Sequence, residues 1–194
     1  MSKDKLKVVG FDPSLSNWGV VIGSYDKHTK QLVITDAYVI DSKPSKVKDV
    51  RTNSKDIMRA EDLYKESLRA MEDAIFVSAE VPVGSQTARA MASYGVCVGV
   101  VAALNFTLPV IQTTAEEGKI LACNSKTASK ADMIAWAMNK HPELPWKYHK
   151  DPKTGEQVIT AKWAEHVADA LASLYVMLET DEVKRTVNML SILR

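Results

Sequence analysis

Three apolar runs, each rich in valine and isoleucine and bounded by turn residues, open the chain. Runs of this length and composition are typical of buried β-strands. They predict strands over residues 6–12, 18–25 and 31–40. Because only short turns separate the three, they suggest an antiparallel meander.

The periodicity changes after a linker, residues 41–53, that is rich in Lys, Ser and Pro. Strand, loop and helix then alternate, which adds parallel strands to the meander. We expect strands over 74–81 and 108–113, and helices over 56–74, 87–105, 114–122, 129–140 and 161–179. The capping signal Thr114-Ala115-Glu116-Glu117 supports the helix that it begins. Residues 141–160 hold three prolines and predict a long loop or a hairpin.

Acidic side chains stand at the ends of two predicted strands. Asp12 ends the first apolar run and Glu80 ends the run that begins at residue 74. The two can converge if their strands are neighbours in one sheet. On the last helix, His166 and Asp169 are three positions apart and Glu165 and Asp169 are four apart, so either pair can share a face. Asp169 is common to both pairs.

Together these groups predict a carboxylate site for hard divalent cations. Phosphodiester hydrolysis needs an activated water and a stabilised leaving oxygen, and two ions roughly 3.5–4 Å apart supply both. Magnesium keeps several waters, so three or four acidic groups are enough to hold it.

Each member of this set also has an ordinary structural interpretation. Asp12 precedes Pro13, where an aspartate is commonly a turn or cap residue. A lone His166 is more often a half-buried histidine with its hydrogen bonds satisfied, and Glu165 can be a solvated helix position. Glu80 is more suggestive, because uncompensated burial of a carboxylate is costly. The combination is more specific than any single residue.

Size and composition favour one soluble domain over residues 1–194, since 194 residues of which 46% are hydrophobic can bury a full core. The net charge of +1 neither indicates nor excludes a nucleic-acid partner. Cys97 and Cys123 lack CxxC spacing and are interpreted as reduced thiols of a cytoplasmic protein. The first five residues do not begin a signal peptide, and the apolar run 96–106 is too short to span a bilayer, so we expect no membrane partner.

Three motifs resemble those of the RuvC family of Holliday-junction resolvases, which have the ribonuclease H-like fold. They are Gly10-Phe11-Asp12-Pro13-Ser14-Leu15, the strand-end Glu80, and His166-Val167-Ala168-Asp169-Ala170. Residues 94–103 are similar to the family's small-residue helix, and residues 114–119 and 127–134 to its two lysine-bearing stretches. The likeness covers most of residues 6–178 at the level of motifs.

This resemblance implies an α/β ribonuclease H-like fold, with a mixed five-stranded sheet of an antiparallel meander followed by parallel strands, flanked by helices. It implies a crossover junction endodeoxyribonuclease that uses Mg²⁺ or Mn²⁺, two ions per site, and leaves a 5′-phosphate and a 3′-hydroxyl. The implied metal ligands are Asp12, Glu80, His166 and Asp169. Lys119 and Lys130 would face the DNA backbone or the scissile phosphate, which makes Lys130 a catalytic candidate as well. Because imidazole suits transition metals, His166 makes manganese worth testing.

The chain departs from the family pattern in two places. The family often has an aromatic residue after the catalytic Glu, and residues 81–86 offer none, so preference for strict four-way junctions over other branched DNA stays open. The stretch 142–160 is longer than the family loop, and its aromatic and basic residues, Trp146 and Lys147 among them, suit base stacking and phosphate contact. The alternative is an exposed hairpin whose aromatics pack on the body.

Two groups of basic residues could neutralise phosphates. The first is Lys43, Lys46, Lys48, Arg51 and Lys55 in and beside the linker, and the second is Lys119, Lys126 and Lys130. Charged loops are usually only solvated, and this favours the second group, which the family pattern matches. The predicted substrate contacts are therefore Lys119, Lys126, Lys130, Trp146 and Lys147.

The small residues of the helix at 87–105 permit close backbone approach, which packing on its own sheet can explain. The family forms homodimers, and a two-fold dimer would place two cutting sites on a junction. Three rival functions remain: a nuclease for flap DNA or structured RNA, a non-catalytic junction binder, and an actin-like ATPase or sugar kinase. The last needs further glycine-rich phosphate loops, and the chain has 8 glycines.

Overall fold

The structure is a computed structural model that describes residues 4–43, 51–81, 84 and 86–192. Its centre is a five-stranded sheet in the order β3-β2-β1-β4-β5. The strands are β1 (Lys5–Asp12), β2 (Asn17–Asp26), β3 (Leu32–Asp41), β4 (Ala74–Glu80) and β5 (Val110–Thr113). β1, β2 and β3 pair antiparallel, and β4 and β5 continue the sheet in parallel with β1. This confirms the predicted mixed sheet.

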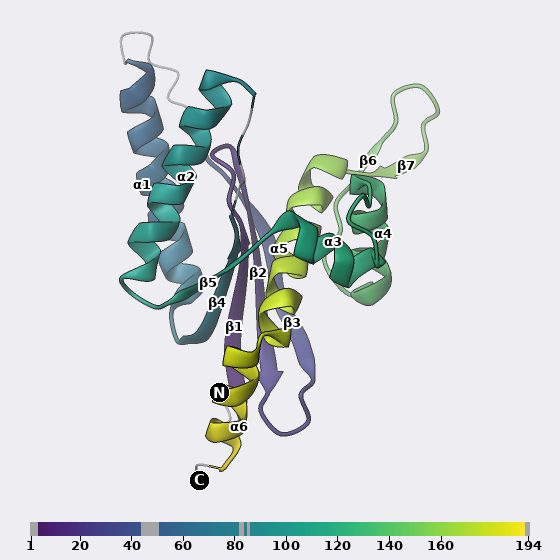
Figure 1. Cartoon of the computed structure of the whole chain (residues 1–194). Coiled ribbons are helices and arrows are strands. Elements are labelled where there is room, and N and C mark those ends of the chain that lie inside the picture. Colours follow the sequence, from purple (N-terminus) through teal and green to yellow (C-terminus); the bar gives the residue numbers. More distant parts are fainter. Residues whose placement is uncertain (1–3, 44–50, 82–83, 85, 193–194) are drawn as a thin grey trace.

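Helices cover both faces of the sheet. They are α1 (Thr52–Met71), α2 (Ala88–Asn105), α3 (Ala115–Cys123), α4 (Lys130–Lys140), α5 (Ala161–Glu179) and α6 (Asp181–Ile192). Figure 1 shows α1 and α2 on one face and α5 on the other, with α3 and α4 beyond α5. A separate hairpin of β6 (Tyr148–Lys150) and β7 (Gln157–Ile159) precedes α5.

The capping signal predicted at Thr114 is present, and two other features of the helices differ from the prediction. Thr114 and Ser129 each accept from a backbone N–H and receive the reciprocal bond, which are complete capping boxes. α1 begins at Thr52, inside the stretch predicted as linker, and α6 was not predicted. α6 forms because Val183 and Val187, four residues apart, bury one apolar stripe against the end of α5.

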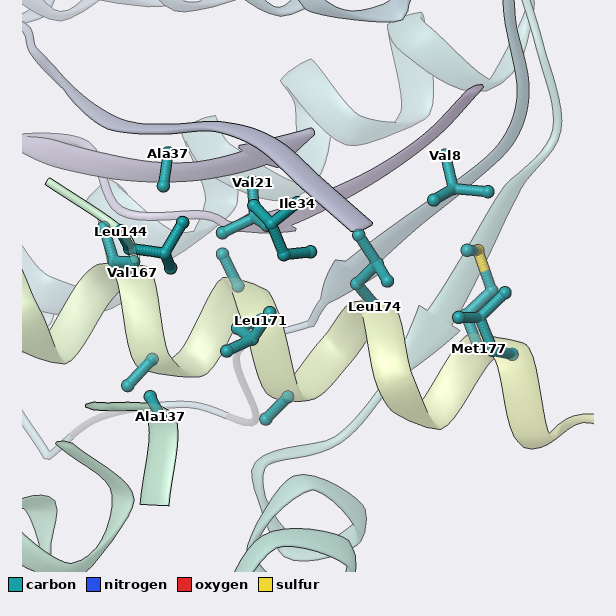
Figure 2. Close-up of a cluster of buried hydrophobic side chains, with 14 of the residues drawn as sticks. Val8, Val21, Ile34, Ala37, Ala137, Leu144, Val167, Leu171, Leu174 and Met177 are labelled. Atoms are coloured by element: carbon teal, nitrogen blue, oxygen red, sulfur yellow. The ribbon is translucent and has the colours of Figure 1, made fainter. Parts of the chain in front are cut away.

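Alternation along β1 builds two cores, because successive side chains point to opposite faces. Val8 packs in a cluster with Leu174 and Met177 of α5 (Figure 2). Its neighbour Val9 packs on the other face with Leu63 of α1 and with the buried residues of α2. The sheet is therefore fixed from both sides, and so is the position of its strand ends.

α2 is apolar but poorly covered. Among the described residues, α2 is the one helix that is long and apolar enough to cross a membrane. Only 22% of its residues Ala88–Asn105 are buried. Soluble proteins also contain such helices, so the indication is weak. Met91 and Val98 are 48% and 44% exposed. Gly95 and Gly99 have no atom within 4 Å of an added Cβ. The sheet therefore does not account for all the small and apolar residues of this helix.

Candidate active site

The sheet brings Asp12 and Glu80 to the same edge. β1 and β4 are parallel neighbours, and their last paired residues are Phe11 and Ala79. Asp12 and Glu80 each follow directly, so the convergence that the sequence allowed does occur. The negative charge of Asp12 acts on Glu80 and contributes to its raised pKa.

Two glycines let α5 cross the sheet at close range. A Cβ on Gly19 would overlap the backbone carbonyl of His166, and a Cβ on Gly10 would overlap that of Ala170 and lie 2.8 Å from Leu174 Cβ. Only glycine permits this approach. The close contact sets the helix residues 166–170 against the end of β1.

A hydrogen bond joins the helix to the strand. His166 Nδ1 lies 2.5 Å from Asp12 Oδ2, and both side chains are more than four-fifths buried. Burial raises the pKa of Asp12, and the bond to His166 opposes that effect. Burial alone would lower the pKa of His166, but the bond to Asp12 and the charges of Glu165 and Asp169 raise it. The imidazole is thus held in a strongly negative environment.

Glu80 and Asp169 are the unsatisfied members of the group. Burial, followed by the charges of Asp12 and Asp169, raises the pKa of Glu80 to about 8. Burial, followed by the charges of Asp12 and Glu165, raises the pKa of Asp169 to about 7. Within the described part of the chain neither carboxylate has a hydrogen-bond or ion-pair partner.

This donor set fits divalent cations. The charge of Asp12 raises the pKa of both Glu80 and Asp169, and a cation at this low-dielectric edge would relieve the repulsion. In the described residues no three His, Cys, Asp or Glu side chains already stand in a metal-binding arrangement. The ligand assignment of Asp12, Glu80, His166 and Asp169 stays a prediction.

The predicted lysines occupy different surroundings. Lys130 begins α4, forms an ion pair with Glu165, and its charge acts on Asp169 and Asp12. The charge of Lys119, on α3, lowers the pKa of Glu80 and so opposes the effect of burial. Lys126 is paired with Glu116 at 2.6 Å. Two of the three lysines therefore lie within electrostatic reach of the carboxylates.

Trp146 and Lys147 lie at the root of the β6–β7 hairpin. The Trp146 ring meets the Trp163 ring edge to face at 5.8 Å, and its Nε1 donates to the carbonyl of His141 at 3.0 Å. Lys147 Nζ lies over the Trp163 ring, 5.2 Å from its centroid. Trp146 is partly buried by these contacts, while Lys147 remains exposed. Their substrate contacts stay predictions.

The first basic group is described only in part. Lys43 pairs with Asp41 at 2.9 Å, and Arg51 and Lys55 stand at the start of α1. Lys46 and Lys48 lie outside the described residues.

Sequence reasoning missed a buried arginine beside the site. Arg59 Nη2 donates to the carbonyl of Leu15 at 2.9 Å and to Ser16 Oγ at 2.7 Å, and its Nε donates to the carbonyl of Ser42 at 3.0 Å. Arg59 thereby fixes the loop that follows Asp12. The signal available in the sequence is weak: Arg59 stands four residues before Leu63, so the two share a face of the helix.

A buried hydroxyl chain was also missed. Ser173 Oγ of α5 donates to Ser78 Oγ of β4 at 3.0 Å and accepts from Thr113 Oγ1 of β5 at 2.8 Å. The chain pins α5 across two parallel strands, one turn after Asp169.

No protein-family model and no curated protein sequence matches this chain. Solved structures do match. Thermus thermophilus RuvC in complex with a Holliday junction substrate superposes with a TM-score of 0.61 at 16% identity, covering 94% of this chain and 97% of that one. A second T. thermophilus RuvC structure gives 0.60 at 15% identity, covering 88% and 92%. The yeast mitochondrial Holliday junction resolvase gives 0.54 at 10% identity, covering 94% and 85%. The chain therefore has the RuvC-like, ribonuclease H-like fold that the motifs implied.

Proposed function

We propose that this protein is a divalent-metal-dependent endonuclease that cuts branched DNA, with the four-way Holliday junction as its main substrate. The observation that carries the proposal is the edge where Glu80 and Asp169, both partly buried and without partners among the described residues, lie beside the Asp12–His166 pair. The RuvC-like fold supports the substrate class, since matching structures are Holliday junction resolvases.

Asp12, Glu80 and Asp169 would hold Mg²⁺ or Mn²⁺, two ions in each site, with His166 as a further ligand or as the group that orients the attacking water. Bound there, the ions would supply an activated water and stabilise the leaving oxygen. Cleavage would leave a 5′-phosphate and a 3′-hydroxyl.

The residues of the chain itself would bind and orient the substrate. Lys130 would contact the scissile phosphate. Its charge acts on Asp12 and Asp169, and its ion pair with Glu165 of α5 holds its ammonium group beside these carboxylates. Lys119 would face the phosphate on the Glu80 side. Lys126, Trp146 and Lys147 would bind DNA farther from the cut. Each lysine that contacts a phosphate should add to the salt dependence of binding.

A homodimer belongs to the same proposal, since two sites related by a two-fold axis would cut the two opposed strands of a junction. The exposed apolar side of α2 supports this part. Its expected setting is cytoplasmic DNA recombination and repair.

The deciding experiment is cleavage of an end-labelled synthetic four-way junction beside matched duplex, flap and single-stranded DNA, with Mg²⁺, Mn²⁺ or chelator. Wild type should make paired, metal-dependent cuts in the junction. Asp12→Asn should bind the junction with little change but cut more than about a hundredfold slower, because one ligand is lost. Asp62→Asn, an exposed position on α1, is the matched control and should cut normally.

Retained cleavage by Asp12→Asn would overturn the site assignment. Equal cutting of every branched form would replace the resolvase with a general debranching nuclease. Metal-independent binding without cutting would leave a junction-binding protein, and cutting of structured RNA alone would move the substrate to RNA.

A further inference from the structure

The β6–β7 hairpin is a ribbon with almost no cover. Five of its six strand residues are exposed, and only Ile159 is partly buried. Figure 1 shows it extending away from the body beside the start of α5. A lone two-stranded ribbon is at best marginally stable in water, so the stability of this one must come from its ends.

The turn of the hairpin is well built. Asp151 Oδ1 accepts from the backbone N–H groups of Lys153 and Thr154 at 2.7 and 3.0 Å. Asp151 N donates to the carbonyl of Glu156 at 2.8 Å, and Gly155 adopts φ +73°. This positive φ suits glycine. The turn therefore holds the two strands in register and uses the carboxylate of Asp151.

The root of the hairpin is fixed to the helix of the candidate site. Besides the contacts of Trp146 and Lys147 with Trp163, Thr160 N donates to the carbonyl of Lys147 at 2.7 Å. Trp163 is three residues before His166 on α5, less than one turn away. A ribbon anchored in this way keeps a defined orientation toward the site.

One face of the ribbon carries a free aromatic and a free cation. Tyr148 pairs with Ile159 and Lys150 pairs with Gln157, so these four side chains share a face. Tyr148 is 52% exposed. Within the described residues neither the Tyr148 nor the Lys150 side chain has a hydrogen-bond, ion-pair or ring partner. On the other face, His149 Nδ1 lies 3.3 Å from Thr160 Oγ1.

The charge around the ribbon is complementary to a polyanion. Residues 147–162 hold four lysines, Lys147, Lys150, Lys153 and Lys162, and two carboxylates, Asp151 and Glu156. The carboxylate of Asp151 accepts hydrogen bonds from backbone N–H groups of the turn, so Glu156 is the main exposed negative charge of the ribbon. Lysines beside a free aromatic ring suit a nucleic-acid strand, which offers phosphates and base faces together.

We propose that the Tyr148–Lys150 face of the hairpin binds the DNA arm that leaves the active site, with Lys150 on a phosphate and Tyr148 stacked on a base exposed near the branch. This inference rests on the proposed function and adds the surface that selects branched over continuous duplex DNA. Loss of this face should weaken branched-DNA binding while leaving the cutting chemistry of bound substrate intact.

The test measures binding to a four-way junction and to matched duplex, in an Asp12→Asn background with chelator, over a range of salt concentrations. Tyr148→Ala with Lys150→Ala should weaken junction binding about tenfold and reduce the salt slope by about one. The effect on duplex should be smaller. His149→Ala with Val158→Ala on the opposite face is the matched control and should leave junction affinity within about twofold. Glu156→Lys should tighten binding.

Cleavage of saturated junction by the Tyr148/Lys150 variant, measured with Asp12 intact, should stay near the wild-type rate. Wild-type junction affinity and salt slope in that variant would overturn the hairpin proposal while the nuclease stands. A larger loss in the His149/Val158 variant would overturn the assignment of the face. No binding of branched DNA by wild type would overturn both proposals. Unchanged melting temperatures show that the exposed substitutions leave the fold intact.

Discussion

His166 Nδ1 lies 2.5 Å from Asp12 Oδ2, although 154 residues separate the two in the chain. The bond occupies one oxygen of Asp12 and fixes the plane of the imidazole ring. His166 can therefore act by positioning Asp12 or by giving its own lone pair to a metal. The two roles differ in what they predict for metal preference.

Substitutions of His166 should separate these roles. If it is a ligand, His166→Asp should keep Mg²⁺-supported cleavage within about tenfold while lowering the ratio of the Mn²⁺ rate to the Mg²⁺ rate, because imidazole favours transition metals and carboxylate favours hard ions. His166→Ala should lose about 10- to 100-fold with either metal, as expected when a group that orients a metal ligand is removed. Initial cleavage rates in the two metals measure this. An unchanged ratio in His166→Asp would leave His166 with the positioning role alone.

The stability of the metal-free protein should fall as pH rises from about 5 to 8. The pKa of Glu80 is raised from 4.5 to about 8 and that of Asp169 from 3.8 to about 7, because both are buried beside other carboxylates. Since the folded state holds these protons more tightly than the unfolded chain, folding is favoured at low pH and loses that contribution up to the folded pKa values. The melting temperature in chelator should drop by at least about 5 °C over this range.

Two additions control this pH experiment. Millimolar Mg²⁺ or Mn²⁺ at pH 8 should restore the melting temperature, because an ion that binds only the folded state stabilises it. Asp169→Asn should flatten the pH dependence, since it removes one of the repelling charges. A melting temperature that is independent of pH in wild type would show that the carboxylates are not crowded as described.

The Asp12–Glu80 pair shows what the sequence could and could not provide. Apolar run lengths placed both carboxylates at strand ends, and this needed no structure. That β1 and β4 are neighbours depends on the strand order, which skips β2 and β3, and run lengths carry no information about it. Gly10 and Gly19 can be read from the sequence, but only the structure shows that α5 packs directly against them.

Gly10→Ala should destabilise the protein by about 2–4 kcal/mol, because the added methyl meets backbone of α5, which cannot move without the whole helix. Gly23→Ala is the matched control on β2. Its Cβ would lie 2.6 Å from Leu32 Cδ1, the end of a flexible side chain that can rotate away, and 3.2 Å from Val8 Cγ2, which must shift by only a few tenths of an ångström. Its cost should therefore be at least about 1 kcal/mol lower than that of Gly10→Ala. Urea unfolding gives both values, and similar costs at the two positions would mean that α5 is not seated on Gly10.

Arg59→Met should destabilise by about 3 kcal/mol, since it removes the guanidinium donors to the carbonyls of Ser42 and Leu15 and leaves the Leu15 carbonyl with the Ser42 hydroxyl as its donor. Arg59→Lys should rescue little, because one ammonium cannot reproduce the guanidinium fork. Arg69→Ala on the same helix is the control. Its side chain is 73% exposed and forms a surface ion pair with Glu66, so its loss should cost below about 1 kcal/mol. Equal effects of the Arg59 and Arg69 substitutions in urea unfolding would contradict this anchoring role.

The role of Arg59 and the strands of the hairpin could not be predicted from the sequence pattern. A charged residue on a helix is predicted as solvated, and only the fold shows that carbonyls of two loops converge on Arg59. Residues 141–160 were predicted as a loop or hairpin because prolines and charges interrupt any period, and the strands of the hairpin are too short to show alternation. The lysines near the carboxylates were found only through the family motifs.

The uncovered side of α2 leads to the last prediction, the homodimer. α1 and α2 form a shallow groove lined by Ala60, Tyr64, Val96, Gly99, Val100 and Ala103, together with Glu61. Gly99→Arg should leave the protomer folded, because an added Cβ at Gly99 has open space around it. It should weaken the dimer at least about tenfold, since the long arginine side chain would fill the groove and bring a charge into an apolar contact. Met189→Arg on α6, also exposed, is the control and should stay dimeric.

Sedimentation measures the oligomeric state, and the pattern of cuts gives an independent readout. A monomeric Gly99→Arg variant should nick one strand of a junction at a time, because paired cutting needs two sites held at a fixed distance, whereas cutting per site should change little. A Gly99→Arg variant that stays dimeric would place the interface on another face. A wild type that is monomeric on junction DNA and still cuts both strands together would remove the dimer from the proposal.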